Sequence, residues 1–215
     1  MDKMDKKICF VFGAGEYYGA SPPEPGAGDL VIAADGGYAY LAAHNTPVNL
    51  VIGDFDSLAS ADIFENIEIE IIRLSTMKDD TDMAAALREG WERGCRVFHI
   101  YGGTGGRLDH TLANIQCLAD LAKRGGRGFL FDKETVITVI HNDTLLFPAG
   151  AQGTVSLFAH SDIALGVTIK GFKYSLNNAT LQNTYPLGVS NEFTGEPGSI
   201  AVREGTLIAV YPKNL

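Results

Sequence analysis

The sequence predicts an α/β fold in which an open, mainly parallel sheet with flanking helices precedes an antiparallel β-sandwich. Up to about residue 132, short apolar runs alternate with helical patterns, an order typical of βαβ units and a parallel sheet. From about residue 133 the helical patterns end, and short alternating runs follow one another between Gly, Asn and Pro. We therefore expect two domains, residues 1–132 and 133–215.

Six apolar runs of the first domain are the predicted strands of the parallel sheet. Each is short and is followed by Gly, Asp or Ser, as is usual for strands buried on both faces. These runs are residues 8–12, 30–34, 50–52, 69–74, 96–101 and 128–131. Apolar residues at helical spacing predict two helices between them, over residues 81–93 and 108–123, and Gly125 and Gly126 end the second helix.

The second domain is predicted to consist of short strands with one buried face. These strands are residues 135–140, 154–158, 167–169, 199–202 and 207–211. Their alternation of apolar and polar residues is typical of a sandwich or small barrel. Because roughly 80 residues can carry only a small core, we expect this domain to pack on the first domain or on another subunit.

Composition narrows the classes of function. The chain has 215 residues, a formal net charge of -9 and a pI near 4.9, which argues against nucleic acid and against a membrane surface as partners. The apolar run after residues 1–7 is too short for a signal peptide, so we expect a cytoplasmic protein. The cysteines, Cys9, Cys95 and Cys117, form no CxxC pair, and neither a disulfide framework nor a zinc site is expected.

Four polar clusters follow predicted strands of the first domain, at the sheet edge where α/β proteins bind ligands. The first cluster is Asp35, Gly36 and Gly37. The glycines allow a ligand to approach the backbone, and a helix that starts near Gly37 would offer free N–H groups to an anion. Asp35 binds a ribose or a metal ion, or it simply caps a turn.

The second cluster contains Asp54 and Asp56, which directly follow a predicted buried strand. Two carboxylates this close on a tight turn repel each other unless a cation binds them or one is protonated. Mg²⁺ suits the pair because it takes oxygen ligands and keeps waters that phosphate oxygens can replace. The alternative is a solvated acidic turn.

The third cluster precedes the first predicted helix. Asp80 or Thr81 is a good N-cap, and carboxylates are favourable at a helix N-terminus. Capping alone does not explain three aspartates and a lysine together in residues 78–82. We expect Asp82 to complete a magnesium site with Asp54 and Asp56. Lys78 is a candidate phosphate contact, whereas Asp79 and Asp80 are expected to cap the helix or lie on the surface.

The fourth cluster is residues 102–106, with four glycines, followed by Arg107, Asp109 and His110. A glycine loop that opens onto a helix can cradle an anion, and a guanidinium beside it suits a polyphosphate. The loop lacks the GK[ST] of a Walker A motif. It is not a Rossmann fingerprint either, because it follows a strand late in the domain. Asp109 and His110 orient Arg107, contact substrate or cap the helix.

Four motifs in this order, ADGG, GDFDS, KDDTD and GGTGGRLDH, resemble those of the thiamine pyrophosphokinase (thiamine diphosphokinase) family, in its bacterial form. Residues 166–174 and 188–192 are similar to the thiamine-domain motifs of that family. The resemblance covers nearly the whole chain and implies an α/β nucleotide domain followed by a β-sandwich. Residues 16–28 match no family motif.

The resemblance implies a homodimer in which thiamine lies between the first domain of one subunit and the second domain of the other. It implies that Mg²⁺ is bound by Asp54, Asp56 and Asp82. The residues implied for ATP are Asp35, Gly36, Lys78, Thr81, Gly103, Arg107 and Asp109. Those implied for thiamine are Asp54, Asp109, His110, Tyr174, Ser190 and Asn191. Tyr174 would stack on a thiamine ring.

The implied activity is magnesium-dependent transfer of diphosphate from ATP to the thiamine hydroxyl, which releases AMP. Its catalytic residues would be Asp54, Asp56, Asp82 and Arg107. Two alternatives remain. The first is a phosphatase in which Asp54 forms an aspartyl-phosphate. The second is a sensor that binds nucleotide or thiamine without catalysis.

Overall fold

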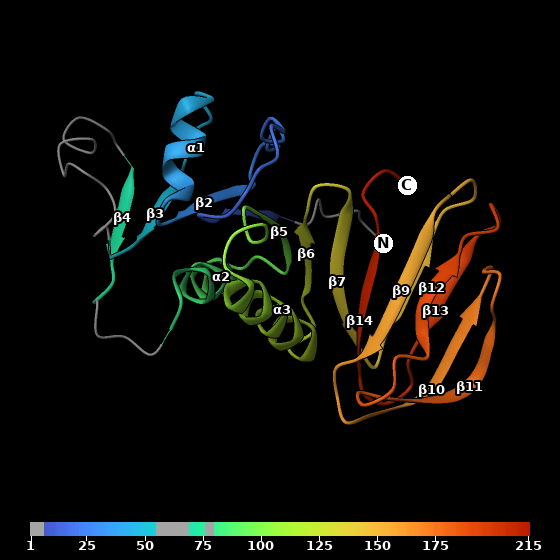
Figure 1. Ribbon diagram of the computed structural model, residues 1–215. Helices are drawn as coiled ribbons and strands as arrows, with labels where there is room; N and C mark the ends of the chain where they lie inside the picture. The colour runs from blue at the N-terminus through green and yellow to red at the C-terminus, as the bar shows by residue number, and fades with distance from the viewer. Residues whose placement is uncertain (1–6, 55–68, 76–79) are drawn as a thin grey trace. The chain divides into compact units, whose positions relative to one another are not determined.

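The structure is a computed structural model that describes residues 7–54, 69–75 and 80–215. The chain divides into two compact units, residues 1–117 and 118–215, and the division falls within helix α3 (Leu108–Lys123) (Figure 1). The first unit alternates strands and helices, and the second consists of strands after the end of α3. The domain boundary expected after residue 132 stays a prediction.

The first unit is built on a parallel sheet with the strand order β4-β3-β2-β1-β5. Its elements before α3 are β1 (Ile8–Phe12), β2 (Leu30–Ala34), α1 (Gly37–Ala43), β3 (Leu50–Gly53), β4 (Glu70–Arg73), α2 (Asp82–Glu92) and β5 (Val97–Tyr101). The chain places β2, β3 and β4 on one side of β1 and then β5 on the other side. The topological switch point therefore lies between β1 and β5, and ligands bind outside the carboxyl ends of the strands at such a point.

Helices cover both faces of this sheet (Figure 1). On one face, Phe10 and Phe12 of β1 share a core cluster with Leu41 of α1. On the other face Cys9 lies against α2, where a Cβ added to Gly90 would come within 2.7 Å of the cysteine sulfur. Burial on both faces explains why β2 and β3 are continuous apolar runs. None of the helices in the described residues is both long and apolar enough to cross a membrane.

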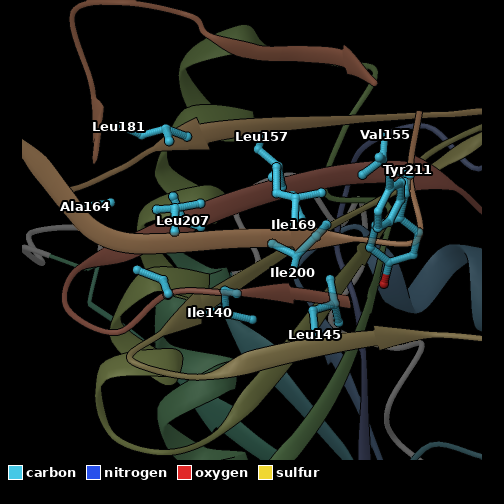
Figure 2. Packing of buried hydrophobic residues seen from close by; sticks show 14 of the residues in the cluster. Ile140, Leu145, Val155, Leu157, Ala164, Ile169, Leu181, Ile200, Leu207 and Tyr211 are labelled. Carbon is cyan, nitrogen blue, oxygen red and sulfur yellow. The ribbon is translucent and has the colours of Figure 1, made fainter. Parts of the chain in front are cut away.

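The second unit is an antiparallel sandwich with the strand orders β12-β9-β14-β7-β6 and β11-β10-β13-β8. Its strands are β6 (Arg127–Phe131), β7 (Thr135–His141), β8 (Thr144–Phe147), β9 (Thr154–Ala159), β10 (Ile163–Lys170), β11 (Leu176–Gln182), β12 (Gly188–Glu192), β13 (Gly198–Ala201) and β14 (Thr206–Pro212). Side chains from both layers, among them Leu157, Ile169 and Ile200, form one buried core (Figure 2).

The fold class expected from the sequence is confirmed, and the predicted helices and the first two predicted strands are found within one residue of their predicted bounds. Strands β8, β11 and β12 are absent from the sequence prediction. The last two are edge strands, LNNATLQ and GVSNE, whose side chains are mostly exposed, so no apolar alternation marks them. The strand predicted over residues 167–169 is longer, and glycine at 166 interrupts its apolar pattern.

Candidate active site

A pocket of about 790 Å³ lies at the switch point of the first unit. Its walls come from the segments that follow β1, β2 and β5, from the first turn of α2 and from the first two turns of α3. The lining residues are 13–15, 34, 35, 81–83, 102–104, 106, 107, 110, 111, 113 and 114. Residues expected from the sequence to bind ligand are thus brought together here, namely Asp35, Thr81, Asp82, Gly103, Arg107 and His110.

The turn after β2 holds Asp35 in a strained conformation at the pocket. Its φ is 47°, in the left-handed region that residues with a Cβ seldom adopt, and its N–H donates to the carbonyl of Ile52 at 2.8 Å. Strain of this kind is often retained at functional sites, so it supports a ligand-binding role for Asp35. The neighbouring Gly36 is the N-cap of α1 and does not line the pocket.

The carboxylates expected to bind a metal ion are only partly described. Asp82 lines the pocket from the first turn of α2, and Asp54 follows Gly53, which packs against the backbone of Asp35. Asp56 lies outside the described residues. Within the described part of the chain, no three His, Cys, Asp or Glu side chains gather closely enough to hold a metal ion. The three-aspartate site stays a prediction, although carboxylate oxygens are donors that Mg²⁺ prefers.

The N-terminus of α2 is capped by a side chain, as expected. Thr81 adopts an extended conformation, and its hydroxyl oxygen accepts a hydrogen bond from the N–H of Ala84 at 3.1 Å. Asp80 pairs with Arg88 on the surface, which agrees with the surface role expected for it. Lys78 lies outside the described residues, so its phosphate contact stays a prediction.

An ion pair between Arg107 and Asp109 directly follows the glycine loop, residues 102–106. The Nε of Arg107 donates to Asp109 Oδ1 at 3.1 Å, and Nη2 donates to Oδ2 at 2.6 Å. This bidentate contact raises the pKa of Arg107 and lowers the pKa of Asp109. Both side chains are mostly exposed, so the pair contributes little to stability but keeps the charged guanidinium beside the pocket. The backbone N–H of His110 also donates to Asp109, at 3.0 Å.

Asn114 is a pocket residue that the sequence reasoning missed. It is 5% exposed, and its Nδ2 donates to the carbonyl of Gly103 at 2.8 Å, which ties α3 to the glycine loop. Asn114 lies about one helical turn after His110, so the two residues share a face of α3, and Arg107 directly precedes the helix. That spacing was the available signal. Residues 13–15, Gly-Ala-Gly, also line the pocket and were not singled out.

In the second unit, Asn191 connects the segments that carry the predicted thiamine ligands. Its buried side chain accepts a hydrogen bond from the N–H of Tyr174 at 3.0 Å and donates to the carbonyl of Tyr174 at 2.7 Å. Tyr174 is itself 60% exposed. Ser190 is exposed and has a left-handed φ of 59°, and its N–H donates to the hydroxyl of Ser156 at 3.1 Å. The Asn191 amide is thus engaged within the protein, whereas Tyr174 and Ser190 are accessible.

Two family models match the chain in succession. The model for "Thiamin pyrophosphokinase, catalytic domain" matches residues 27–129, and the model for "Thiamin pyrophosphokinase, vitamin B1 binding domain" matches residues 137–207. The chain belongs to the thiamine pyrophosphokinase family. As a member of that family it is an enzyme with thiamine diphosphokinase activity, a transferase that uses thiamine and ATP.

Relatives support the thiamine pyrophosphokinase assignment along most of the chain. The thiamine pyrophosphokinase of Bacillus subtilis (strain 168) is 31% identical over 168 residues, which cover 74% of this chain and 75% of the relative. A crystal structure of thiamine pyrophosphokinase from Bacillus subtilis has a TM-score of 0.85 and 27% identity, and covers 98% of this chain and 100% of that one. The structure of thiamin pyrophosphokinase from Geobacillus thermodenitrificans has a TM-score of 0.83 and 27% identity. The match covers 96% of this chain and 98% of that one.

Proposed function

We propose that the chain transfers diphosphate from ATP to the hydroxyl of thiamine in a magnesium-dependent reaction, and that the pocket of the first unit binds the ATP phosphates. The observation that carries the proposal is this pocket at the switch point, which Arg107 and the glycine loop line together with Asp35 and Asp82. Backbone N–H groups and a guanidinium bind phosphate oxygens, and carboxylates bind the cation that accompanies them.

In the proposed reaction, the thiamine hydroxyl oxygen forms a bond to the β-phosphorus of ATP. The bond from that phosphorus to the oxygen it shares with the α-phosphorus breaks, and the hydroxyl proton is lost. Diphosphate remains on thiamine, and AMP leaves with the bridging oxygen. A transfer of this kind depends on alignment and on neutralisation of charge rather than on a covalent enzyme intermediate.

Arg107 is the residue that we expect to bind the transferred phosphates. Asp109 holds its guanidinium through two hydrogen bonds, so the planar group is already oriented when the ligand arrives. Asp35 is proposed to bind the ribose, and Thr81 leads into the α2 N-terminus, which favours an anion. The proposed ATP contacts of Gly36, Lys78 and Gly103 rest on the sequence motifs.

Asp54, Asp56 and Asp82 are proposed to hold Mg²⁺. Asp82 and Asp54 fit this role in kind, because they offer hard oxygen donors at the pocket and beside the Asp35 turn. A bound Mg²⁺ would supply positive charge that offsets the phosphate charges. The three aspartates would hold that charge between the carboxyl end of β3 and the start of α2.

Tyr174 is proposed to stack on a ring of thiamine, because thiamine is a cation and an accessible aromatic face attracts cations. Ser190 is proposed to bind thiamine by hydrogen bonding, with Asn191 beside it. In the expected homodimer, Asp54, Asp109 and His110 of the other subunit complete the thiamine site. The homodimer and the cytoplasmic location stay predictions from the sequence.

The proposal is tested by incubating the protein with ATP, Mg²⁺ and thiamine and identifying the products. Thiamine diphosphate and AMP are expected in equal amounts, and product formation should stop when the metal is chelated and recover when Mg²⁺ is restored. Release of ADP would contradict diphosphate transfer. A trapped aspartyl-phosphate would favour the phosphatase alternative, and tight binding of both ligands without product would favour the sensor.

A further inference from the structure

The segment that follows β1 forms a backbone wall of the pocket. We call residues 13–18 the β1 loop. The N–H groups of Gly13, Gly15 and Glu16 donate to the carbonyls of Tyr101, Gly102 and Thr104 at 2.8, 2.7 and 2.9 Å. These bonds extend the pairing of β1 with β5 beyond both strands and join the β1 loop to the glycine loop. The match to the catalytic family model begins at residue 27, so the β1 loop lies outside that match.

Glycines allow the two loops to touch through their backbones. A Cβ added to Gly15 would lie 2.6 Å from the carbonyl oxygen of Gly102, which is closer than real Cβ contacts. A Cβ added to Gly102, whose φ is 61°, would lie 2.6 Å from the ring of Tyr17. Gly13, Gly15 and Gly102 all line the pocket, so bare backbone forms this wall.

Tyr17 fixes the β1 loop from behind this wall. Its hydroxyl donates to the carbonyl of Gly13 at 2.5 Å, and its ring stacks on the ring of Tyr40 with centroids 3.5 Å apart and planes inclined by 3°. Both rings adjoin the core cluster of the α1 face, which contains Phe12. Burial raises the pKa of Tyr17 above its ordinary value of 10, so the hydroxyl is protonated at neutral pH and stays a donor well above it.

The carbonyl that Tyr17 binds matters because the pocket is proposed to bind an anion. An unpaired carbonyl oxygen in an anion pocket presents the negative end of its dipole to the ligand. The carbonyls of Tyr101, Gly102 and Thr104 are satisfied by the β1 loop, and that of Gly103 is satisfied by Asn114. The Gly13 carbonyl is satisfied in the same way, because it accepts a hydrogen bond from the hydroxyl of Tyr17.

We propose that Tyr17 is a positioning residue for ATP: by holding the Gly13 carbonyl it fixes the β1 loop against the glycine loop, and the joined backbones then take up the polyphosphate. This inference rests on the proposed function of the pocket. Tyr17 is not a pocket-lining residue, so it acts through the backbone that it holds and not through contact with the ligand.

The test compares Tyr17→Phe with Tyr40→Phe. Each substitution removes one phenol hydroxyl that donates at 2.5 Å to a backbone carbonyl. Each leaves both aromatic rings of the stacked pair in place. The carbonyl bound by Tyr40 belongs to Ala20, which does not line the pocket. Tyr40→Phe is therefore a matched control for the loss of a hydroxyl from the stack.

We expect Tyr17→Phe to weaken binding of a non-hydrolysable ATP analogue, measured by calorimetry, by about fivefold to tenfold, the usual size for loss of one hydrogen bond. The KM for ATP should rise in parallel, and the KM for thiamine should not change. Tyr40→Phe should change each constant by less than about twofold. Equal effects of the two substitutions would show a merely structural role and would overturn the proposal, as would unchanged analogue binding by Tyr17→Phe.

Hydrogen exchange on the unsubstituted protein gives a second measurement that does not depend on a variant folding. Adding the ATP analogue should slow exchange of the β1-loop amides Gly13, Gly15 and Glu16, because the ligand holds the joined backbones together. Unchanged exchange there would contradict the proposal. The analogue binds without turnover, so these experiments test the role of Tyr17 in ATP binding independently of the reaction. They remain informative even if the product assay returns ADP and the proposed reaction fails.

Discussion

The two units place their candidate functional residues in different ways. In the first unit, strands such as β2 are wholly buried, and the polar residues lie in the loops after the strand ends or in the first turns of the helices that follow. In the second unit, Ser190 and Asn191 lie within an edge strand, and the buried amide of Asn191 holds the backbone that carries Tyr174. Loops outside a core can be altered with little loss of stability, whereas residues within a strand serve both packing and binding.

The largest effect is expected from Asp54→Asn in the first unit. Removing the carboxylate should lower turnover by roughly 100-fold to 1,000-fold, because a charge aligned with the phosphates is lost. The midpoint of thermal unfolding should stay close to that of the parent protein, since Asp54 follows the end of β3. Asp80→Asn, which removes a surface ion pair with Arg88, is the control and should retain activity. Near-normal turnover of Asp54→Asn would refute its metal role.

In the second unit, Ile200→Ala is expected to act on stability. Ile200 is fully buried in the sandwich core, so its truncation should cost about 2–5 kcal/mol in the free energy of unfolding, measured with urea. The control is Leu146→Ala in the paired strand β8, where Leu146 is 73% exposed and should cost less than about 0.5 kcal/mol. Equal costs would contradict the core assignment.

Asn191→Ala tests whether the buried amide of Asn191 supports thiamine binding by holding the backbone of Tyr174. Loss of both hydrogen bonds to Tyr174 should raise the KM for thiamine about tenfold, and binding of the ATP analogue should not change. If Asn191 acts through Tyr174, the double variant with Tyr174→Ala should be no worse than Tyr174→Ala alone. Additive losses would instead indicate that Asn191 binds thiamine directly.

The smallest effect concerns pH and His99, which is half-buried in β5 beside the ring of Phe10. Burial lowers the pKa of His99 below the ordinary 6.5, and the nearby Asp29 opposes this in part. The folded protein thus binds fewer protons than the unfolded chain, so stability is present above pH 6.5 and is lost as pH falls through the lowered pKa. His99→Gln should lose less unfolding free energy than the parent protein between about pH 7.5 and about pH 5. Identical losses in urea titrations would contradict this.

Much of the candidate site was accessible from the sequence because the carboxyl ends of parallel strands meet at one edge. Asp35, Asp82 and Arg107 were placed there by the strands or loops that precede them, and the structure brings them to one pocket. The β1 loop and Asn114 were missed, because their roles come from hydrogen bonds to the glycine loop. Nothing in the residues 13–18 themselves indicates that partner.

The sequence by itself determined the fold class, the order of the two parts and the family, because apolar runs and motifs are local patterns that survive in a linear chain. Tertiary structure alone decided that β5 lies beside β1 and so brings the glycine loop against the β1 loop. It also decided that Tyr17 holds a wall of the pocket while the similar Tyr40 does not. The physical reason is that a backbone hydrogen bond depends on which segments the sheet order makes neighbours, and a local pattern of residues does not show that order.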